Sequence, residues 1–170
     1  MTLLDRHGFR PDSFLRIPAA EMAGHPAVIL PGAELTAGLL VRGLGQRIGI
    51  DIANTIPVEE VAQLANQVDL IAIAFPGFAD GRGFTLGRRL RRAGFRGILR
   101  AVGPLIPDQF AYALACGFDE VELPDAVAAR QGEAAWLADL AIYRQSYQRD
   151  YSRGENILDA RRLGRDGGAA

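Results

Sequence analysis

The sequence predicts an α/β fold in which about five parallel strands alternate with helices. Three observations lead to this expectation. Short apolar segments recur along the chain, segments with one apolar helical face lie between them, and proline or glycine stands at most of the junctions. Alternation of this kind is typical of right-handed βαβ units. Five strands suit either an open flavodoxin-like sheet or part of a (β/α) barrel, and the hydrophobic pattern does not separate the two.

The chain is expected to have three parts. Residues 1–25 form a small N-terminal β-arm, because short apolar segments there flank a turn at His7-Gly8. Residues 26–151 form a single α/β domain, since a chain of 170 residues with 49% apolar content can bury one substantial core. Residues 152–170 are rich in Arg, Gly, Asp and Ala and are expected to be a mobile tail.

Five apolar segments are the expected strands. They cover residues 27–30, 48–52, 70–74, 97–102 and 118–123. The third is apolar at every position, as expected for a strand that is covered on both faces. The carboxyl ends of parallel strands meet at one edge, so the functional residues near them are expected at one rim. Those residues are Asp51, the loop at 75–85, Arg100, Gly103 and Glu122.

The first three expected helices lie between these strands. One lies near residues 34–40, and Pro57 opens the second, because proline suits the first turn of a helix. The third is rich in arginine, with Thr85 as its N-cap and Gly94 or Gly97 at its end. The arginines expected on its solvated face are Arg88, Arg91 and Arg92, with Arg89 at the border of that face.

Further helices follow in the second half of the chain. Pro107 begins one that ends at Gly117, and Asp125 is expected to cap the next. A long C-terminal helix then carries an aromatic face, formed by Trp136, Leu140, Tyr143 and Tyr147. This face packs against the core, a second copy of the chain or a partner protein, and the sequence leaves these alternatives open.

The stretch from Phe75 to Gly94 joins the third strand to a glycine-rich loop and the arginine-rich helix. Backbone N–H groups at a helix N-terminus, the helix dipole and guanidinium groups all favour a bound anion. Seven arginines and no acid occur from Arg82 to Arg100, and Asp80 stands at the entrance of the loop. We therefore expect this loop to bind a small oxyanion or the phosphate or sulfate group of a nucleotide.

Two of these arginines have alternative interpretations. Arg82 lies between two glycines, and Arg100 interrupts an apolar strand, where an unpaired charge is very costly. The partner of Arg100 is therefore Asp80, Asp51, Glu122 or a bound anion. Whether the two arginines form internal ion pairs or a ligand site is left open at this point.

The other polar and aromatic residues near this loop also have two interpretations. Asp108 and Gln109 follow a proline at a helix start, where they serve the helix terminus or bind a ligand. Phe75, Phe78 and Phe84 either stack on a planar ligand or form a plug over the sheet.

The dinucleotide cofactors NAD and FAD and metal ions are not expected. The Gly81–Gly87 run has the spacing GxGxxxG, but six residues separate it from the strand end at Ala74, and no acid follows the next strand to hold a ribose. One cysteine and two histidines do not supply a ligand set for zinc or an iron–sulfur cluster. The chain also has no nucleophile elbow, P-loop or HExxH helix, so its catalytic residues, if any, are unknown.

Charge and hydropathy exclude two classes of partner. A net charge of −1 is unlike that of nucleic-acid-binding domains, which usually have a basic face and a high pI. No apolar run approaches the ~20 residues of a membrane span, and charged residues interrupt the start of the chain where a secretory signal would be apolar. The protein is therefore expected to be cytoplasmic and to bind neither nucleic acid nor membrane.

A longer ordered pattern connects these residues. It runs through Phe75-Pro-x-Phe-x-Asp-Gly-Arg-Gly-Phe84, Gly97-x-Leu-Arg-Ala-Val-Gly103, Asp108-Gln109 and Gly117-Phe-Asp-x-x-Glu-Leu123. The pattern resembles the bacterial domain of unknown function 934 family. Members are often encoded beside sulfite reductase and other sulfate-assimilation genes, and many carry an oxidoreductase label without a defined activity. The resemblance therefore implies an accessory protein of assimilatory sulfate and sulfite reduction, with sulfite reductase or another enzyme of that process as its partner.

The candidate ligand-binding residues are Asp80, Gly81, Arg82, Gly83, Thr85, Arg100, Gly103, Asp108 and Gln109. All of them except Thr85 also belong to the family pattern. Two hypotheses follow for the function. The first is an accessory protein that acts by contact, with the aromatic terminal helix serving a partner or a homodimer. The second is an enzyme or sensor that binds a phosphate- or sulfate-bearing nucleotide.

Overall fold

The computed structural model describes residues 1–142 of the chain. Its strands are β1 (Thr2–Asp5), β2 (Gly8–Arg10), β3 (Leu15–Arg16), β4 (Ala27–Pro31), β5 (Arg47–Ile52), β6 (Leu70–Ala74), β7 (Ile98–Val102) and β8 (Glu120–Leu123). Its α-helices are α1 (Leu35–Leu40), α2 (Val58–Leu64), α3 (Arg82–Arg92), α4 (Pro107–Ala115), α5 (Asp125–Arg130) and α6 (Glu133–Ile142). Short 3-10 helices are η1 (Ala19–Glu21), η2 (Gly32–Glu34) and η3 (Ala65–Gln67).

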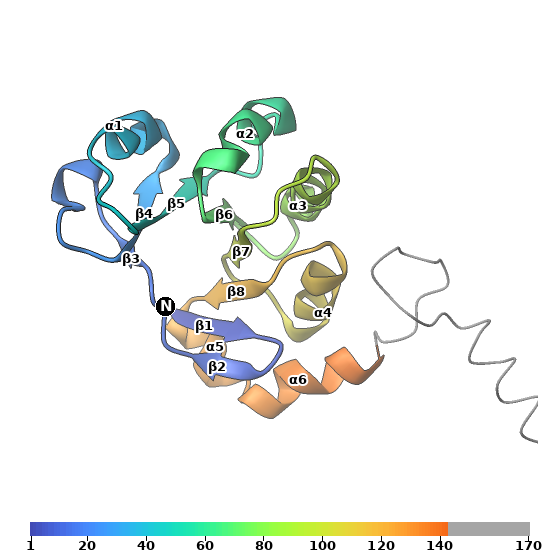
Figure 1. Ribbon diagram of the computed structural model, residues 1–170. Helices are drawn as coiled ribbons and strands as arrows, with labels where there is room; N and C mark the ends of the chain where they lie inside the picture. Colours follow the sequence, from blue (N-terminus) through green and yellow to red (C-terminus); the bar gives the residue numbers. More distant parts are fainter. Residues whose placement is uncertain (143–170) are drawn as a thin grey trace, which may run out of the picture.

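All eight strands form one curled, mostly parallel sheet. Its order is β2-β1-β8-β7-β6-β5-β4-β3, in which β3 to β8 are parallel and β1 and β2 are added in antiparallel fashion. Figure 1 shows helices α1 to α4 following one another along the outside of the sheet, which curls into a half-barrel. Of the two architectures that suited five strands, the structure therefore has the partial barrel. The five expected parallel strands are confirmed, and three strands of the arm extend the same sheet.

The two faces of the sheet differ in how they are covered. Helices bury the convex face, where alternate residues of the strands, such as Val28, Ile50 and Ile73, belong to the main core. The concave face has a second, smaller apolar cluster, made of Phe14, Ala27, Ile29, Leu70 and Ala72. Strand β6 contributes to both clusters, which explains why its sequence is apolar at every position.

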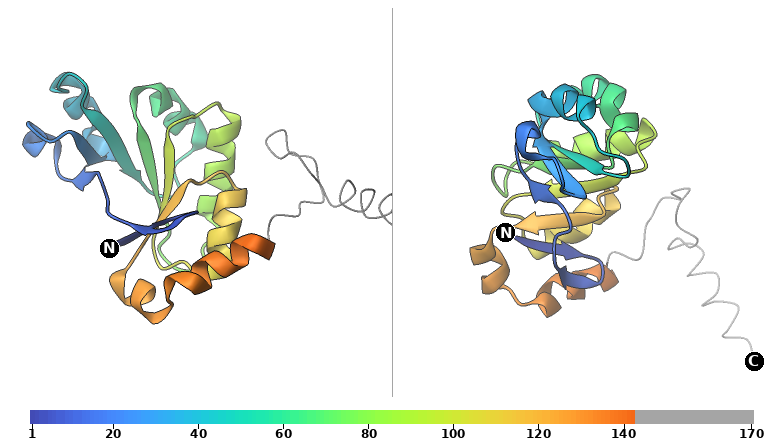
Figure 2. Two further views of the ribbon diagram at one scale, coloured as in Figure 1. Left: turned by 60° about the horizontal axis from the view of Figure 1, so that its bottom comes forward. Right: turned by 60° about the vertical axis from the view of Figure 1, so that its left-hand side comes forward.

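A short segment of the arm closes the concave side of the half-barrel. Strands β2 and β3 follow each other in the sequence but lie at opposite ends of the sheet, and only residues 11–14 connect them. Five residue steps from Arg10 to Leu15 span at most about 18 Å, so the curl brings the two edges of the sheet close together. Figure 2 shows this N-terminal segment passing in front of the sheet. We call residues 11–16 the strap.

Two expected helix caps are wrong. Helix α3 begins at Arg82 with Gly81 as its N-cap, so Thr85 lies in the first turn instead of capping it. The reason is that the Asp80 carboxylate accepts a hydrogen bond from the backbone N–H of Arg82 and satisfies the terminus earlier. Asp125 lies in the first turn of α5, after its N-cap Pro124, and its carboxylate binds the N-terminal amino group instead.

The last described helix is part of the core. Trp136 of α6 is fully buried, its ring lies 6.2 Å from that of Phe110, and its indole N–H donates to the carbonyl oxygen of Gln131. The aromatic face was expected to pack against the core, a second copy or a partner protein, and at Trp136 it packs against the core. Tyr143, Tyr147 and the expected tail at 152–170 lie outside the described residues. Within residues 1–142, no helix combines the length and apolar content needed to cross a membrane.

Candidate functional site

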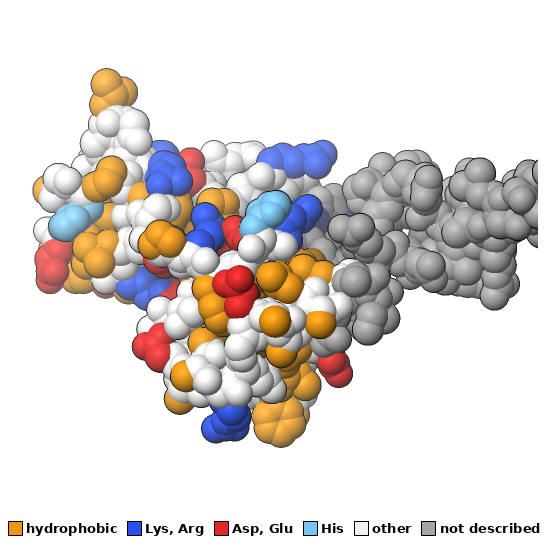
Figure 3. Space-filling model, turned by 90° about the horizontal axis from the view of Figure 1, so that it is seen from below, with side chains coloured by type: hydrophobic (Ala, Val, Ile, Leu, Met, Phe, Trp, Pro, Cys, Tyr) orange, Lys and Arg blue, Asp and Glu red, His pale blue; other side chains and the backbone are white. Residues whose placement is uncertain are grey.

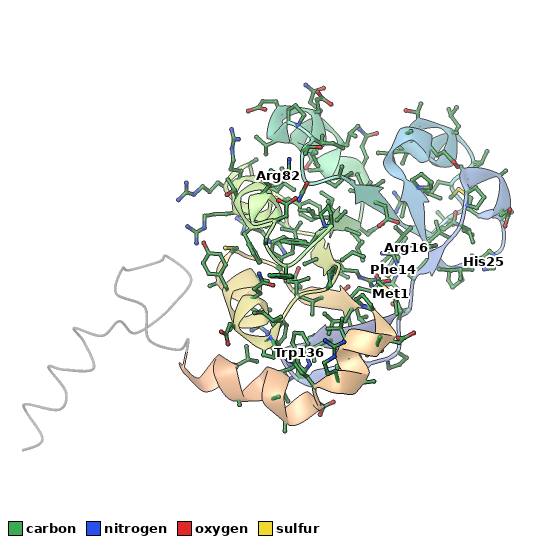
Figure 4. The ribbon with its side chains drawn as sticks, turned by 180° about the vertical axis from the view of Figure 1, so that it is seen from behind. Met1, Phe14, Arg16, His25, Arg82 and Trp136 are labelled. Carbon is green, nitrogen blue, oxygen red and sulfur yellow. The ribbon has the colours of Figure 1, made fainter. Side chains whose placement is uncertain are left out.

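The structure divides the candidate residues between two places. All of them except Arg100 lie in the loops and first helical turns that follow β6 and β7, at the carboxyl rim of the sheet. Arg100 lies within β7, where its side chain contacts residues of the concave face. Figure 4 shows Arg82 beside the start of α3, apart from Phe14 and Arg16 on the concave side. The two arginines therefore do not converge on one ligand.

The two rim loops are fastened to each other. The Gln109 side chain donates to the carbonyl oxygen of Phe78 over 2.5 Å and accepts from the backbone N–H of Ile106 over 3.3 Å. Gly103 lies against the carbonyl oxygen of Phe75, where an added Cβ would come within 2.0 Å. Gln109 and Gly103 thus have clear structural roles in shaping the rim.

The glycine-rich loop carries its own anion. The Asp80 carboxylate accepts hydrogen bonds from the backbone N–H of Arg82, from its Nε at 2.9 Å and from its Nη2 at 2.7 Å. These hydrogen bonds from Arg82, with a contribution from nearby Asn54, hold the pKa of Asp80 well below its usual value. Asn54 is buried, and its Nδ2 makes no hydrogen bond of ordinary geometry within the described residues. A carboxylate therefore already occupies the N-terminus of α3.

The remaining loop residues are explained by packing more than by ligand chemistry. A Cβ at Gly83 would come within 2.3 Å of the Phe75 ring, so the glycine is needed for that ring to pack. Phe75 and Phe84 are both buried, with ring centroids 4.8 Å apart, and form the plug that was one of the two interpretations. Thr85 is exposed.

Phe78 differs from the other two phenylalanines. It is 69% exposed, and Ile106 on the neighbouring loop is 42% exposed. Charged residues follow each of them closely in the sequence, Asp80 and Arg82 after Phe78 and Asp108 after Ile106. We define the rim surface as Phe78, Asp80, Arg82, Ile106 and Asp108.

Arg100 is satisfied entirely by carboxylates of the protein. It is 1% exposed, and its Nε donates to Glu120 at 2.7 Å while Nη1 donates to Glu122 at 3.0 Å. Its Nη1 and Nη2 also donate to the two carboxylate oxygens of Asp12 in the strap. Of the expected partners, Glu122 is confirmed, whereas Asp80 and Asp51 bind other arginines. Burial acts to lower the pKa of Arg100, but hydrogen bonds and attraction from Asp12 and Glu120 outweigh it, so the pKa is raised.

The ion pairs around Arg100 extend across the concave face. Arg16 of the strap binds Glu122 and Asp51, and Arg10 of β2 binds Glu120 and Asp5. Including Arg100 and Asp12, three guanidinium groups face five carboxylates. Even with Arg47, whose guanidinium lies 4.6 Å from the Phe14 ring centroid, acids outnumber bases. The charge of this network therefore disfavours an added anion.

The solvated face of α3 is smaller than expected. Arg91 is half-buried, and its guanidinium binds the carbonyl oxygens of Gly117, Phe95 and Gly97 and the carboxylate of Asp119. The expectation of solvent exposure was wrong here because the chain returning to β8 lies over this side of the helix. The arginines that are exposed on α3 are Arg82, Arg88, Arg89 and Arg92.

The described residues offer no candidate metal cluster, and the face seen in Figure 3 carries mixed charges. Within the described residues, no group of three or more His, Cys, Asp or Glu side chains is placed to hold a metal ion. Figure 3 shows the two histidines well apart, with acidic and basic side chains interspersed on that face.

Sequence reasoning missed three residues that organise these places, Asp12, Asn54 and Glu120. The register of β7 and β8 sets Arg100 opposite Glu120, so a known strand pairing would have identified that partner. No local signal pointed to Asp12, which lies 88 residues from Arg100.

Comparison with known proteins identifies a family. No curated protein matches the chain. The family model described as "Bacterial protein of unknown function (DUF934)" matches residues 49–157. This range includes the rim surface and Arg100, but not the strap. Because the match covers more than half of the sequence, the chain belongs to this bacterial family.

Proposed function

We propose that the protein is an accessory protein of assimilatory sulfate and sulfite reduction, and that it acts by contact with a partner enzyme. The metabolic assignment is supported by the resemblance to a family whose members are often encoded beside sulfite reductase. Contact as the mode of action is supported by the rim surface. Sulfite reductase is the partner to which we commit.

One observation carries the contact proposal. Phe78 and Ile106 expose apolar side chains on two loops that the Gln109 hydrogen bonds hold together. An exposed aromatic residue on a fixed backbone loses little entropy on binding and is a common centre of a protein interface. The ion pair of Asp80 and Arg82 and the nearby Asp108 supply the polar margin that such interfaces have.

Binding to purified sulfite reductase from the same bacterium tests this proposal. In biolayer interferometry, we expect saturable binding that Phe78→Asp weakens by about tenfold or more, because a charge replaces an apolar anchor. Leu44→Asp is the matched control, since Leu44 is a fully exposed apolar residue between α1 and β5.

Two results would contradict the proposal. Absence of binding at roughly 100 μM leaves less than about 5.5 kcal/mol of association free energy and removes sulfite reductase as the partner. Equal effects of the Phe78 and Leu44 substitutions would remove the rim surface as the contact.

A second candidate function is an enzyme or sensor that binds an oxyanion or a phosphate- or sulfate-bearing nucleotide at the rim. The observation in its favour is Arg82, which is the first residue of α3 and is 62% exposed in its side chain. The Nε and Nη2 of Arg82 donate to Asp80, and no described residue binds the Nη1 of Arg82. That Nη1 group remains able to donate to a ligand anion.

Thermal stability in a ligand panel tests the second candidate. The panel contains sulfate, sulfite, phosphate, adenylyl sulfates, FMN, FAD and NADPH. A ligand at 100 times its dissociation constant stabilises the folded protein by about 2.7 kcal/mol, and Arg82→Ala should abolish that gain. Arg88→Ala, on the same helix, is the control. A panel without any shift, or a shift that survives Arg82→Ala, rejects this candidate.

A further inference from the structure

A second surface, distinct from the rim surface, lies on the outside of the half-barrel. It is a groove of about 350 Å³ between α2 and α3, which lie next to each other along the convex side (Figure 1). Its lining residues are Val58, Glu59 and Ala62 of α2 and Arg89, Arg92 and Ala93 at the end of α3. We call this the α2–α3 groove.

The floor of the groove is apolar and open. Val58, Ala62 and Ala93 contribute small or β-branched side chains, so the two helices leave room between them for a larger side chain from outside. A groove between two helices is a common seat for the apolar face of a third helix. The groove therefore fits an amphipathic helix better than an extended peptide, which binds at sheet edges.

One wall of the groove is strongly basic. Arg89 and Arg92 line it, and Arg96, which is also exposed, follows Arg92 by four residues just beyond the end of α3. Within the described residues, neither Arg92 nor Arg96 has an ion-pair partner. Arg89 binds Glu59 across the groove at 3.4 Å, and both side chains are exposed, so that contact is weak and easily exchanged. Unpaired guanidinium groups beside an apolar floor favour a ligand that carries both carboxylates and an apolar face.

Charge also separates this occupant from a nucleic acid. A nucleic acid would meet Glu59 on the opposite wall, and the chain as a whole has a net charge of −1.

We propose that the α2–α3 groove binds an acidic amphipathic helix of a partner protein. The apolar face of that helix lies on Val58, Ala62 and Ala93, and its carboxylates bind Arg92 and Arg96. Both helices of the groove fall within the matched family range. The proposal goes beyond the rim contact, because the groove shares no residue with the rim surface.

Labelled synthetic peptides test this binding without knowledge of the natural partner. The first peptide has about 18 residues, or five helical turns, with leucines on one face and glutamates along one flank. A second peptide replaces its leucines with serine at the same charge, and a third replaces its glutamates with lysine. Fluorescence anisotropy should show saturable binding of the first peptide alone.

Protein variants then locate the binding. Arg92→Glu/Arg96→Glu should weaken binding of the first peptide by about tenfold or more. The control Arg6→Glu/Arg130→Glu makes the same charge change at two exposed positions, in the β1–β2 turn and at the end of α5. Ala62→Trp, which fills the groove without changing charge, should also weaken binding. Circular dichroism establishes that each variant is folded.

Several results would overturn the proposal. They are equal binding of the serine peptide, which would mean charge attraction alone, and equal effects of the two charge-reversal pairs. Self-association in sedimentation that Arg92→Glu/Arg96→Glu abolishes would make a second copy the occupant instead. Phe78→Asp should leave peptide binding unchanged, so failure of the rim contact and failure of the groove are distinguishable.

Discussion

Asp12 and Arg100 lie 88 residues apart in the sequence and form a two-point ion pair, with Oδ1 2.8 Å from Nη2 and Oδ2 2.5 Å from Nη1. The pair joins the strap to the middle of the sheet. It adds a third carboxylate to a guanidinium that Glu120 and Glu122 already bind. One ion pair therefore both holds the strap in position and compensates the buried charge of Arg100. Substitutions at either residue test it.

The first prediction concerns Arg100→Met. This change keeps most of the side-chain volume but leaves the buried carboxylates of Glu120 and Glu122 without their shared partner. We expect a loss of about 3–5 kcal/mol in the free energy of unfolding, because removing one member of a buried ion pair leaves an uncompensated charge. Urea denaturation followed by circular dichroism measures it.

Arg92→Met is the matched control for this substitution. Arg92 is exposed and has no ion pair within the described residues, so its loss should change stability by less than about 0.5 kcal/mol. If both variants are equally stable, the network is dispensable for folding. Arg100→Lys should lie between wild type and Arg100→Met, since it keeps the charge and loses the two-point geometry.

The second prediction concerns pH. Burial acts to raise the pKa of Asp12, but hydrogen bonds from Arg100 and from the Phe14 N–H outweigh it, so the pKa is lowered in the folded state. A lowered folded pKa adds stability above the unfolded value of about 3.9, and that stability is lost as the pH falls through the folded value. The contribution of Asp12 is therefore fully present at pH 7 and disappears in acid.

Thermal unfolding from neutral pH into acid checks this sign with Asp12→Asn. At pH 7 the variant should lose about 1–3 kcal/mol, because its amide cannot replace a charged two-point acceptor. The difference from wild type should shrink as the pH falls below about 4. Asp108→Asn, at an exposed position on the rim, is the control. A difference between Asp12→Asn and wild type that stays constant across the whole range would exclude titration of Asp12 as its cause.

Much of the fold could be predicted from the sequence, because hydrophobic periodicity and the proline and glycine residues at element boundaries determine secondary structure locally. The apolar run at residues 70–74 coincides with β6, and Pro107 begins α4 as expected. Curvature was not predictable in this way. It depends on all covering helices α1 to α4 lying on one face, and on a four-residue link between β2 and β3 that the hydrophobic pattern does not reveal.

The candidate site was only partly predictable, for a related reason. Sequence reasoning required a partner for Arg100 because its strand is apolar, and it included Glu122 among the candidates. It could not choose Asp12, since that contact depends on how the arm crosses the sheet. At the rim, the spacing of Asp80 and Arg82 indicated an anion-binding loop, whereas the structure has these two residues bound to each other. Local spacing identifies charged groups but does not say whether they satisfy one another.

The third prediction concerns the backbone at Gly103. Its φ of 151° and the carbonyl oxygen of Phe75, 2.0 Å from the position of an added Cβ, leave no place for a side chain. Gly103→Ala should therefore cost about 1–3 kcal/mol or more and displace the loop that carries Phe78. Gly77→Ala is the control in the same loop, because nothing lies within 4 Å of its added Cβ. Equal stability of the two variants in urea denaturation would contradict the close approach of the loops.

The fourth prediction concerns Trp136, the only tryptophan of the chain. Because its indole is fully buried beside Phe110 and donates to a backbone carbonyl, the native emission should be blue-shifted and resistant to acrylamide quenching. Emission should shift to the red in the same urea transition that circular dichroism detects, since α6 belongs to the one main core. Emission typical of solvent-exposed indole in the native protein would mean that α6 is not docked. An earlier fluorescence transition would mean that α6 undocks before the sheet unfolds.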